Sequence, residues 1–369
     1  MSCDFFALAT AGVQGLQPYQ PGKPIEELER EYGIQNIVKL ASNENPLGTN
    51  PLIISELQSS LKQLFRYPDG NGFTLKQALA QKLAVSADMI TLGNGSNDIL
   101  ELVARTFVTA ENSVMFSQYA FAVYPLVTQA MGAKSLKIPA IEWGHDLTAM
   151  QAAVRDDTRV IFIANPNNPT GTWVNHTQLQ TFLAAIPEDK IVVLDEAYFE
   201  YVEESSYPNS LVLLEKFQNL IITRTFSKAY GLAGSRVGYA ISHPKIASLL
   251  NRIRQPFNVN LLALAAATIA LNDQYYLEKS IIANRWGMQQ LIDAFQSMNL
   301  AFIPSVGNFI AVQLPSTGLI IYEKLLREGV IVRPLANYQM PYHLRITIGT
   351  QEENSRFIQA LQKVISIIS

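Results

Sequence analysis

One lysine, Lys228, stands in a stretch of the chain whose neighbouring residues could hold a phosphate. Ser227 precedes it directly and Arg236 follows eight positions later, within the polar, glycine-rich stretch 223–239. An amine can condense with an aldehyde, and a hydroxyl with a guanidinium can bind a phosphate. These are the requirements of an enzyme that carries pyridoxal 5′-phosphate as a Schiff base. Because most lysines are solvated surface charges, the stretch alone leaves phosphate binding and an ordinary loop equally open.

Short apolar runs that alternate with helical patterns, between about residues 75 and 240, would position this lysine. Unbroken apolar runs are typical of parallel strands that are buried on both faces. We therefore expect an α/β fold with a mainly parallel sheet between layers of helices. The runs cover residues 89–92, 113–116, 160–163, 191–194 and 220–222.

A polar cluster follows each of these runs. In open α/β sheets, ligands bind beyond the carboxyl ends of the strands, so the clusters are expected to meet at one edge of the sheet. This convergence is a stronger indication of a ligand site than any single motif. The clusters lie at 93–98, 117–119, 165–171, 195–198 and 227–228.

Several residues at this edge have two interpretations. The stretch 93–98 could attract phosphate through free N–H groups at a helix start, or form an ordinary turn; it lacks the Gly-Lys-Ser/Thr of a nucleotide-hydrolysing loop. Asp195 could cap the next segment, or pair with the nitrogen of a pyridine ring. Tyr198 and Asn168 could reach the phenolic oxygen of that ring. Tyr119 could stack on the ring face, or merely pack.

Two arginines, Arg333 and Arg345, belong to apolar runs in the last part of the chain. A buried arginine needs an anionic partner, which could be a protein carboxylate or the carboxylate or phosphate of a substrate. The four histidines lack the spacing of metal ligands and no Ser-His-Asp grouping accompanies them. We therefore predict no metal site and disfavour hydrolase chemistry.

The length of 369 residues suggests about two domains. We expect residues 1–45 to form an N-terminal arm and the start of a small domain, 46–265 a large cofactor-binding domain, and 266–369 a small C-terminal α+β domain. The proline-rich segment 18–24 should be extended. Thr350 with Glu353 predicts a capping box at the start of the last helix.

Composition excludes several classes of protein. The net charge is −3 with scattered basic residues, which argues against a nucleic-acid partner. The apolar stretch 261–271 is too short to span a bilayer, and Asp4 stands where a signal peptide needs basic residues. The single cysteine, Cys3, fits a reducing compartment. We expect a cytoplasmic protein that contacts no membrane.

The motifs together resemble those of the fold-type I, aspartate-aminotransferase-like superfamily, in which a large domain with a mainly parallel seven-stranded sheet carries a smaller α+β domain. Within it, the chain is similar to the histidinol-phosphate aminotransferase family over nearly its full length. The lysine loop and the Asn-Asn-Pro-Thr-Gly segment at 167–171 are specific to the superfamily. The Asn-Glu-Asn-Pro segment at 43–46 and the Pro-Phe-Asn-Val-Asn segment at 256–260 point to the family.

This resemblance implies a role for each residue of the cofactor site. Lys228 would form the Schiff base and carry the proton, and Asp195 would pair with the pyridine nitrogen. Asn168 and Tyr198 would hold the phenolate oxygen. The groups that bind the cofactor phosphate would be Ser96, Asn97, Ser227 and Arg236.

The resemblance also implies a homodimer, in which Tyr67 reaches the cofactor phosphate of the partner subunit. One departure from the family pattern exists, because the phosphate loop usually reads Gly-Ser-Asp-Glu and here reads Gly-Ser-Asn-Asp at 95–98. Asn97 and Asp98 should leave the backbone N–H groups that would bind the phosphate in place.

The substrates follow from the same resemblance. The reaction would be transamination between L-histidinol phosphate and 2-oxoglutarate, giving imidazole-acetol phosphate and glutamate in histidine biosynthesis. Arg345 would bind the α-carboxylate of glutamate and the substrate phosphate, with Arg333, Tyr19 and Asn43 completing the substrate site. An aromatic amino-acid aminotransferase and a threonine-phosphate decarboxylase are the alternatives on the same scaffold.

Overall fold

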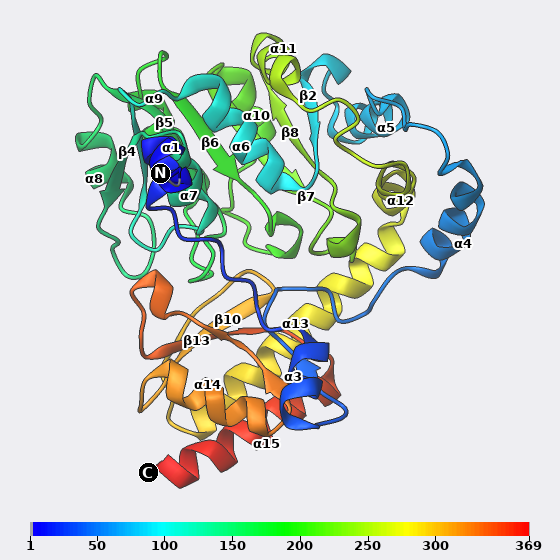
Figure 1. Cartoon of the computed structure of the whole chain (residues 1–369), viewed down its shortest axis with the longest axis vertical. Coiled ribbons are helices and arrows are strands. Elements are labelled where there is room, and N and C mark those ends of the chain that lie inside the picture. Colours follow the sequence, from blue (N-terminus) through cyan, green and yellow to red (C-terminus); the bar gives the residue numbers. More distant parts are fainter. Residues whose placement is uncertain (1–2, 369) are drawn as a thin grey trace.

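The computed structural model describes residues 3–368, and its larger part is built on a seven-stranded sheet (Figure 1). The order of the strands is β2-β8-β7-β6-β5-β3-β4, and only β8 runs antiparallel to its neighbours. The expected mainly parallel sheet is confirmed. The strands are β2 (Ile90–Gly93), β3 (Ser113–Ser117), β4 (Lys134–Ile138), β5 (Thr158–Ala164), β6 (Ile191–Asp195), β7 (Leu220–Thr225) and β8 (Gly238–Ser242).

All five apolar runs form strands of this sheet. The other two strands of the sheet, β4 and β8, were not predicted from the runs. β8 begins with a glycine that belongs to the polar stretch after Lys228, so its sequence reads as loop. β4 lies at the edge of the sheet, and its residues Lys134, Ser135 and Lys137 are exposed. An edge strand need not be apolar, because only part of it faces a core.

Helices cover both faces of the sheet, as expected. Alternation along β5 shows the two cores: Ile161 and Ile163 point to one, whereas Val160 and Phe162 point to the other. The first face carries α5 (Phe73–Leu83), α8 (Leu147–Ala152), α9 (His176–Ala185), α10 (Ser210–Lys216) and α12 (Leu261–Asn272). The second carries α6 (Ser96–Phe107), α7 (Val123–Ala130) and α11 (Pro244–Ile253).

The smaller part of the molecule has its own sheet and core below the first (Figure 1). Its four-stranded antiparallel sheet has the order β12-β13-β10-β9, and β1 pairs with β11 beside it. These strands are β1 (Val38–Lys39), β9 (Phe302–Ile303), β10 (Phe309–Gln313), β11 (Val330–Ile331), β12 (Arg333–Pro334) and β13 (His343–Thr347). The helices are α3 (Ile25–Tyr32), α14 (Gly318–Arg327) and α15 (Gln351–Ile368).

Capping residues start the helices of the C-terminal third. The capping box before α15 is confirmed, since Glu353 N–H donates to Thr350 Oγ1 at 3.2 Å and Thr350 N–H to Glu353 Oε2 at 2.8 Å. Asn260 caps α12, and its side-chain oxygen accepts from Ala263 N–H. The long α13 (Gln274–Ser297) contributes Leu277 to the first core and Leu291 and Phe295 to the second. We propose that the large and small domains meet along this helix.

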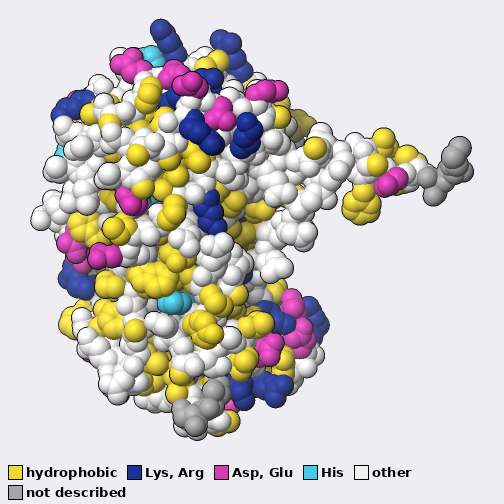
Figure 2. All heavy atoms as spheres, turned by 90° about the vertical axis from the view of Figure 1, so that its left-hand side faces the viewer, with side chains coloured by type: hydrophobic (Ala, Val, Ile, Leu, Met, Phe, Trp, Pro, Cys, Tyr) yellow, Lys and Arg dark blue, Asp and Glu magenta, His cyan; other side chains and the backbone are white. Residues whose placement is uncertain are grey.

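The N-terminal arm begins with two short helices, α1 (Phe5–Leu8) and α2 (Ala11–Gln14), and α2 packs against α7. Residues 16–24 belong to no helix or strand, and Pro24, just before α3, is extended, as predicted for this proline-rich segment. The start of the arm stands out from the body, and Phe5 and Phe6 are 76% and 81% exposed (Figure 2).

No helix within residues 3–368 is both long and apolar enough to cross a membrane. The remaining helix is α4 (Pro51–Ser60), and short 3-10 helices cover Leu61–Gln63, Ala87–Met89, Phe199–Tyr201, Ala233–Ser235 and Ala336–Tyr338.

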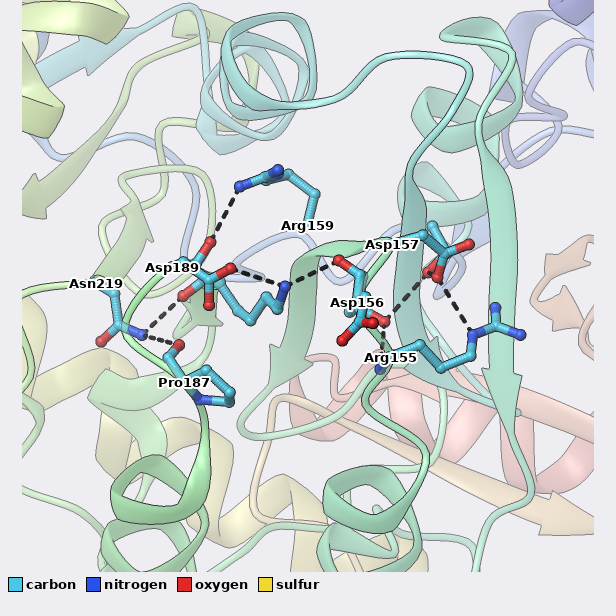
Figure 3. Close-up of polar contacts among 10 residues, drawn as sticks. Arg155, Asp156, Asp157, Arg159, Pro187, Asp189 and Asn219 are labelled. Atoms are coloured by element: carbon cyan, nitrogen blue, oxygen red, sulfur yellow. Dashed lines mark hydrogen bonds and ion pairs between the residues drawn. The ribbon is translucent and has the colours of Figure 1, made fainter.

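A polar network joins the amino ends of β5, β6 and β7 (Figure 3). Lys190 is buried, and its Nζ donates to Asp189 Oδ2 at 2.9 Å and to Asp156 O at 3.0 Å. Asn219 Nδ2 donates to Lys190 O at 2.7 Å and to Pro187 O at 3.3 Å. These contacts satisfy backbone carbonyl groups where neighbouring strands begin, and the carbonyl of Lys190 among them is buried.

Candidate active site

The carboxyl ends of the same strands border a cavity of about 180 Å³ between the two parts of the molecule. Twelve of the fourteen predicted site residues line it. Four of the five expected polar clusters contribute to its wall, whereas the cluster at 117–119 contributes no residue. Tyr67 and Tyr119 do not line it. The predicted residues in its wall are Tyr19, Asn43, Ser96, Asn97, Asn168, Asp195, Tyr198, Ser227, Lys228, Arg236, Arg333 and Arg345.

Lys228 lies in the loop after β7 and its Nζ donates to Ser42 O at 3.1 Å. Burial, followed by the charge of Arg345, lowers the pKa of Lys228 to about 7. A large fraction of the amine is therefore neutral near neutral pH. A neutral amine is the form that attacks an aldehyde carbon, so the site supplies a nucleophile without an adjacent general base.

Asp195 is the last residue of β6 and both of its carboxylate oxygens accept hydrogen bonds. Tyr124 Oη donates to Oδ2 at 2.8 Å, and Thr223 Oγ1 donates to Oδ1 at 3.1 Å. Burial raises the pKa of Asp195, while these two bonds oppose the rise. The carboxylate is thus held at the cavity wall by two neutral donors, and no cation of the protein pairs with it in an ion pair within residues 3–368.

A hydrogen-bonded chain connects further side chains in the cavity wall. The Tyr198 hydroxyl accepts from Asn43 Nδ2 at 2.9 Å and from Asn168 Nδ2 at 3.1 Å. Arg345 Nη1 donates to Asn168 Oδ1 at 2.6 Å and Nη2 to Ala41 O at 2.7 Å. Burial raises the pKa of Tyr198 to about 12 despite the nearby Arg345 charge, so the hydroxyl keeps its proton to donate to a ligand.

Arg345 and Arg333 face each other across the pairing of β13 with β12, and both are buried. The contacts of Arg345 are an amide oxygen and a carbonyl oxygen, and its Nε has no partner among the described residues. The Arg333 guanidinium carbon lies 5.8 Å from the centre of the Tyr19 ring. A structural ion pair does not explain Arg345, which leaves the interpretation that it binds a ligand anion.

The residues around the start of α6 fit a phosphate group. Gly95, with φ +81°, precedes the helix, and a Cβ there would overlap with Arg236 Nη2. Arg236 Nη1 also approaches Ser227 Oγ at 3.4 Å. Among the described residues no side chain caps α6 at Gly95, so the first N–H groups of the helix are open to an anion. Asp98, one of the two residues that depart from the family pattern, accepts from Asn94 N–H at 2.8 Å and thereby holds the loop.

Two tyrosines fall outside the cavity. Tyr119 packs against Trp143 with ring centres 5.2 Å apart, and Phe121 lines the cavity instead. The predicted ring stacking of Tyr119 therefore has no support in the structure. Tyr67 is 82% exposed and stacks on Phe257, which is compatible with a role outside its own chain.

Sequence reasoning missed Tyr124, Thr223 and Phe121. Tyr124 and Phe121 stand in an apolar segment, where an aromatic ring is typical of ordinary core. Thr223 is the first residue of the polar stretch 223–239, and nothing in the sequence singles out its hydroxyl. Tyr124 follows β3 within the predicted helical pattern, and only the fold brings it to Asp195, which is 71 residues away in the chain. Thr223 faces Asp195 because β7 and β6 pair at that position.

Comparisons with known proteins agree with this geometry. The family model described as aminotransferase class I and II matches residues 35–361. Histidinol-phosphate aminotransferase 1 of Nitrosococcus oceani is 58% identical over 98% of both chains. Histidinol-phosphate aminotransferase 2 of Pseudomonas aeruginosa is 57% identical over 98% of this chain and 99% of its own. The crystal structure of histidinol-phosphate aminotransferase from Sinorhizobium meliloti in complex with pyridoxal-5′-phosphate has a TM-score of 0.90 at 30% identity, with 98% of each chain covered.

Proposed function

The chain belongs to the class I and II aminotransferase family, and we propose that it exchanges the amino group between L-histidinol phosphate and 2-oxoglutarate with pyridoxal 5′-phosphate as cofactor. The products are imidazole-acetol phosphate and glutamate, and the reaction belongs to histidine biosynthesis. The observation that carries this assignment is the position of two buried arginines, Arg333 and Arg345, in the wall of the cavity that holds Lys228.

Both substrates carry anionic groups that the guanidinium groups of these arginines can bind. Histidinol phosphate carries a phosphate, and 2-oxoglutarate carries two carboxylates. A planar guanidinium binds either group through paired hydrogen bonds. Since Arg345 has no carboxylate partner within residues 3–368, its charge remains available to the substrate. One anion site can therefore serve both half-reactions in turn.

Each residue of the cavity would have its own role in cofactor binding or proton transfer. When bound, the cofactor supplies an electron sink for the bond changes at the substrate Cα. Lys228 would hold the cofactor covalently and, once free, take the proton from Cα and return it. Asp195 would keep the ring nitrogen protonated, while Asn168 and Tyr198 would donate to the ring oxygen. The phosphate would be bound by Ser96, Asn97, Ser227 and Arg236.

One steady-state comparison tests the substrate. The purified holoenzyme is given 2-oxoglutarate with histidinol phosphate or phenylalanine as amino donor, and glutamate is measured. We expect kcat/KM to favour histidinol phosphate. A higher value for phenylalanine would replace the proposal with an aromatic aminotransferase. Release of CO₂ from threonine phosphate, without glutamate formation, would indicate the decarboxylase instead.

We further propose that the active unit is a homodimer in which Tyr67 contributes to the partner's phosphate site. The Tyr67 patch, formed by Leu61, Leu64, Phe65, Tyr67 and Phe257, is apolar and 42–82% exposed in the single chain. Contiguous apolar surface of this kind is typical of interfaces. In the dimer it would be covered by the second copy.

Mixing inactive variants tests the shared site. Lys228→Ala and Tyr67→Ala homodimers are unfolded, mixed and refolded together. If each site combines Lys228 of one chain with Tyr67 of the other, random pairing restores about a quarter of the sites. Recovery is absent if Tyr67 serves its own chain, because no mixed dimer then contains an intact site.

A cytoplasmic location is also proposed. The support is the cysteine usage of the chain, a single exposed thiol at Cys3. Fractionation of cells that produce the native protein tests it, and we expect the enzyme activity in the cytosolic fraction. Recovery of the activity in a membrane or extracellular fraction would contradict it.

A further inference from the structure

The hydroxyl of Tyr124 has one acceptor at the site, and that acceptor is the carboxylate that faces the cavity. We propose that Tyr124 is a positioning residue for the cofactor: it fixes the orientation of Asp195 and keeps it ionised, so that the carboxylate can bind the protonated nitrogen of the pyridine ring. This inference rests on the proposed cofactor, but not on the identity of the amino donor.

The packing of Tyr124 leaves its ring one orientation. The residue is fully buried on α7, and its ring stacks on Phe162 with centres 4.6 Å apart and planes 5° apart. Phe121 meets the ring edge-on at 5.8 Å. Below it, Thr128 Oγ1 donates to Tyr124 O at 2.7 Å. These two aromatic contacts hold the ring while its hydroxyl donates to Asp195 Oδ2.

The charges around Asp195 explain why a donor is needed there. Burial and the neighbouring Glu196 both raise the pKa of Asp195, and each favours the neutral acid. A protonated Asp195 would have no negative charge to pair with the ring nitrogen. The opposing groups are Tyr124 from α7, Thr223 from β7 and the Ala197 N–H that follows β6, with Lys228 facing the same cavity from the loop after β7.

Tyr124 can serve as this donor at every working pH. Burial and the Asp195 charge both raise the pKa of Tyr124 well above its ordinary value. The proton therefore stays on the tyrosine oxygen. A hydroxyl with a permanent proton strengthens the ionised form of its acceptor without adding a charge of its own to the site.

The test measures cofactor binding as well as turnover. Apoenzyme of wild type and Tyr124→Phe is titrated with pyridoxal 5′-phosphate at several pH values. We expect the variant to bind the cofactor roughly ten- to a hundredfold more weakly, the usual loss for a hydrogen bond to a charged group. Loss of the donor raises the pKa of Asp195, so the acidic fall in affinity should move to higher pH.

A double-mutant cycle separates positioning from simple packing. In an Asp195→Asn background, Tyr124→Phe should have little further effect, because the charge that it supports is gone. The proposal is overturned if Tyr124→Phe weakens binding equally at all pH values, or equally in the Asp195→Asn background. Tyr322→Phe, which removes a half-buried hydroxyl in the small domain, is the control and should leave cofactor affinity unchanged.

A second variant covers the case in which Tyr124→Phe does not fold. Phe162→Leu keeps the hydroxyl but removes the stacked ring that orients it. We expect the same upward shift of the acidic limb, with a smaller loss of affinity. An unchanged pH dependence in this variant would count against a positioning role. Because the readout is cofactor affinity, a failure of the histidinol phosphate assay would not imitate either outcome.

Discussion

The strands β5, β6 and β7 carry polar clusters at both ends, and the two clusters differ in where their partners come from. At the amino ends, Lys190 and Asn219 are bound by groups of the protein itself (Figure 3). At the carboxyl ends, Asp195 and Lys228 line a cavity. Arg345 borders the same cavity from β13 of the smaller sheet, and its buried Nε has no partner among the described residues.

The difference shows how one sheet separates stability from function. A buried polar group with a protein partner is satisfied as soon as the chain folds, so it supports the fold. A buried polar group whose partner is a ligand remains unpaired in the ligand-free protein, and its desolvation then lowers the free energy of unfolding. We therefore expect substitutions at the amino ends to change stability, and substitutions at the carboxyl ends to change activity.

The largest contrast should come from two lysines at opposite ends of the sheet. Lys228→Ala should abolish turnover and the covalent capture of pyridoxal phosphate by borohydride, because it removes the amine that bonds to the cofactor. Lys190→Ala should leave turnover per folded molecule intact while lowering the denaturation midpoint. Turnover and covalent capture retained by Lys228→Ala would refute the assigned nucleophile. Loss of turnover in a folded Lys190→Ala would break the contrast itself.

Two arginines give the next contrast. Arg345→Lys keeps the charge but loses the fork that binds an anion at two points, so KM for both substrates should rise roughly ten- to a hundredfold. Arg159→Lys at the amino end, whose Nη1 donates to Asp189 O at 3.2 Å, is the matched control and should not change KM. A KM for Arg345→Lys equal to that of wild type would show that the substrate anion binds elsewhere.

Burial of the Lys228 amine should make the free energy of unfolding of the apoenzyme depend on pH. The pKa of Lys228 is about 7 in the folded chain and about 10.5 in the unfolded chain, so between these values the unfolded state binds the extra proton. Stability from this group therefore rises with pH across that window. Apo Lys228→Met should be more stable than apo wild type at pH 6.5, and the gap should close toward pH 10. Chemical denaturation at both pH values measures it, and a gap that is independent of pH would contradict the lowered pKa.

The smallest effect is expected at the amino end. Asn219→Ala leaves the carbonyl groups of Lys190 and Pro187 without their donor, which should lower the free energy of unfolding by roughly 1–3 kcal/mol. Its kcat and KM should match those of wild type. Denaturant titration and steady-state kinetics on the same preparation check both statements. A changed kcat with unchanged stability would reverse the assignment of the two ends.

The sequence predicted most residues that line the cavity, but not the residues that hold those side chains in place, such as Tyr124. Runs such as 160–163 are visible because both faces of the strand are buried, and chain order alone then places their polar ends at one edge. Tyr124 could not be found in this way, because its role depends on a contact with a residue 71 positions away. The packing of Tyr119 on Trp143 was equally invisible in the sequence, and its stacking on a cofactor ring stays a prediction.

The edge strand β4 has a consequence for assembly. An exposed strand edge offers unpaired N–H and C=O groups to any further strand, and the charged side chains of Lys134 and Lys137 oppose such an addition. Two copies of the chain are therefore not expected to meet by lengthening the sheet at β4. Association is left to side-chain surfaces such as the Tyr67 patch. In the proposed dimer that surface also delivers a phosphate ligand, so a chain would acquire its partner and its complete active site in the same step.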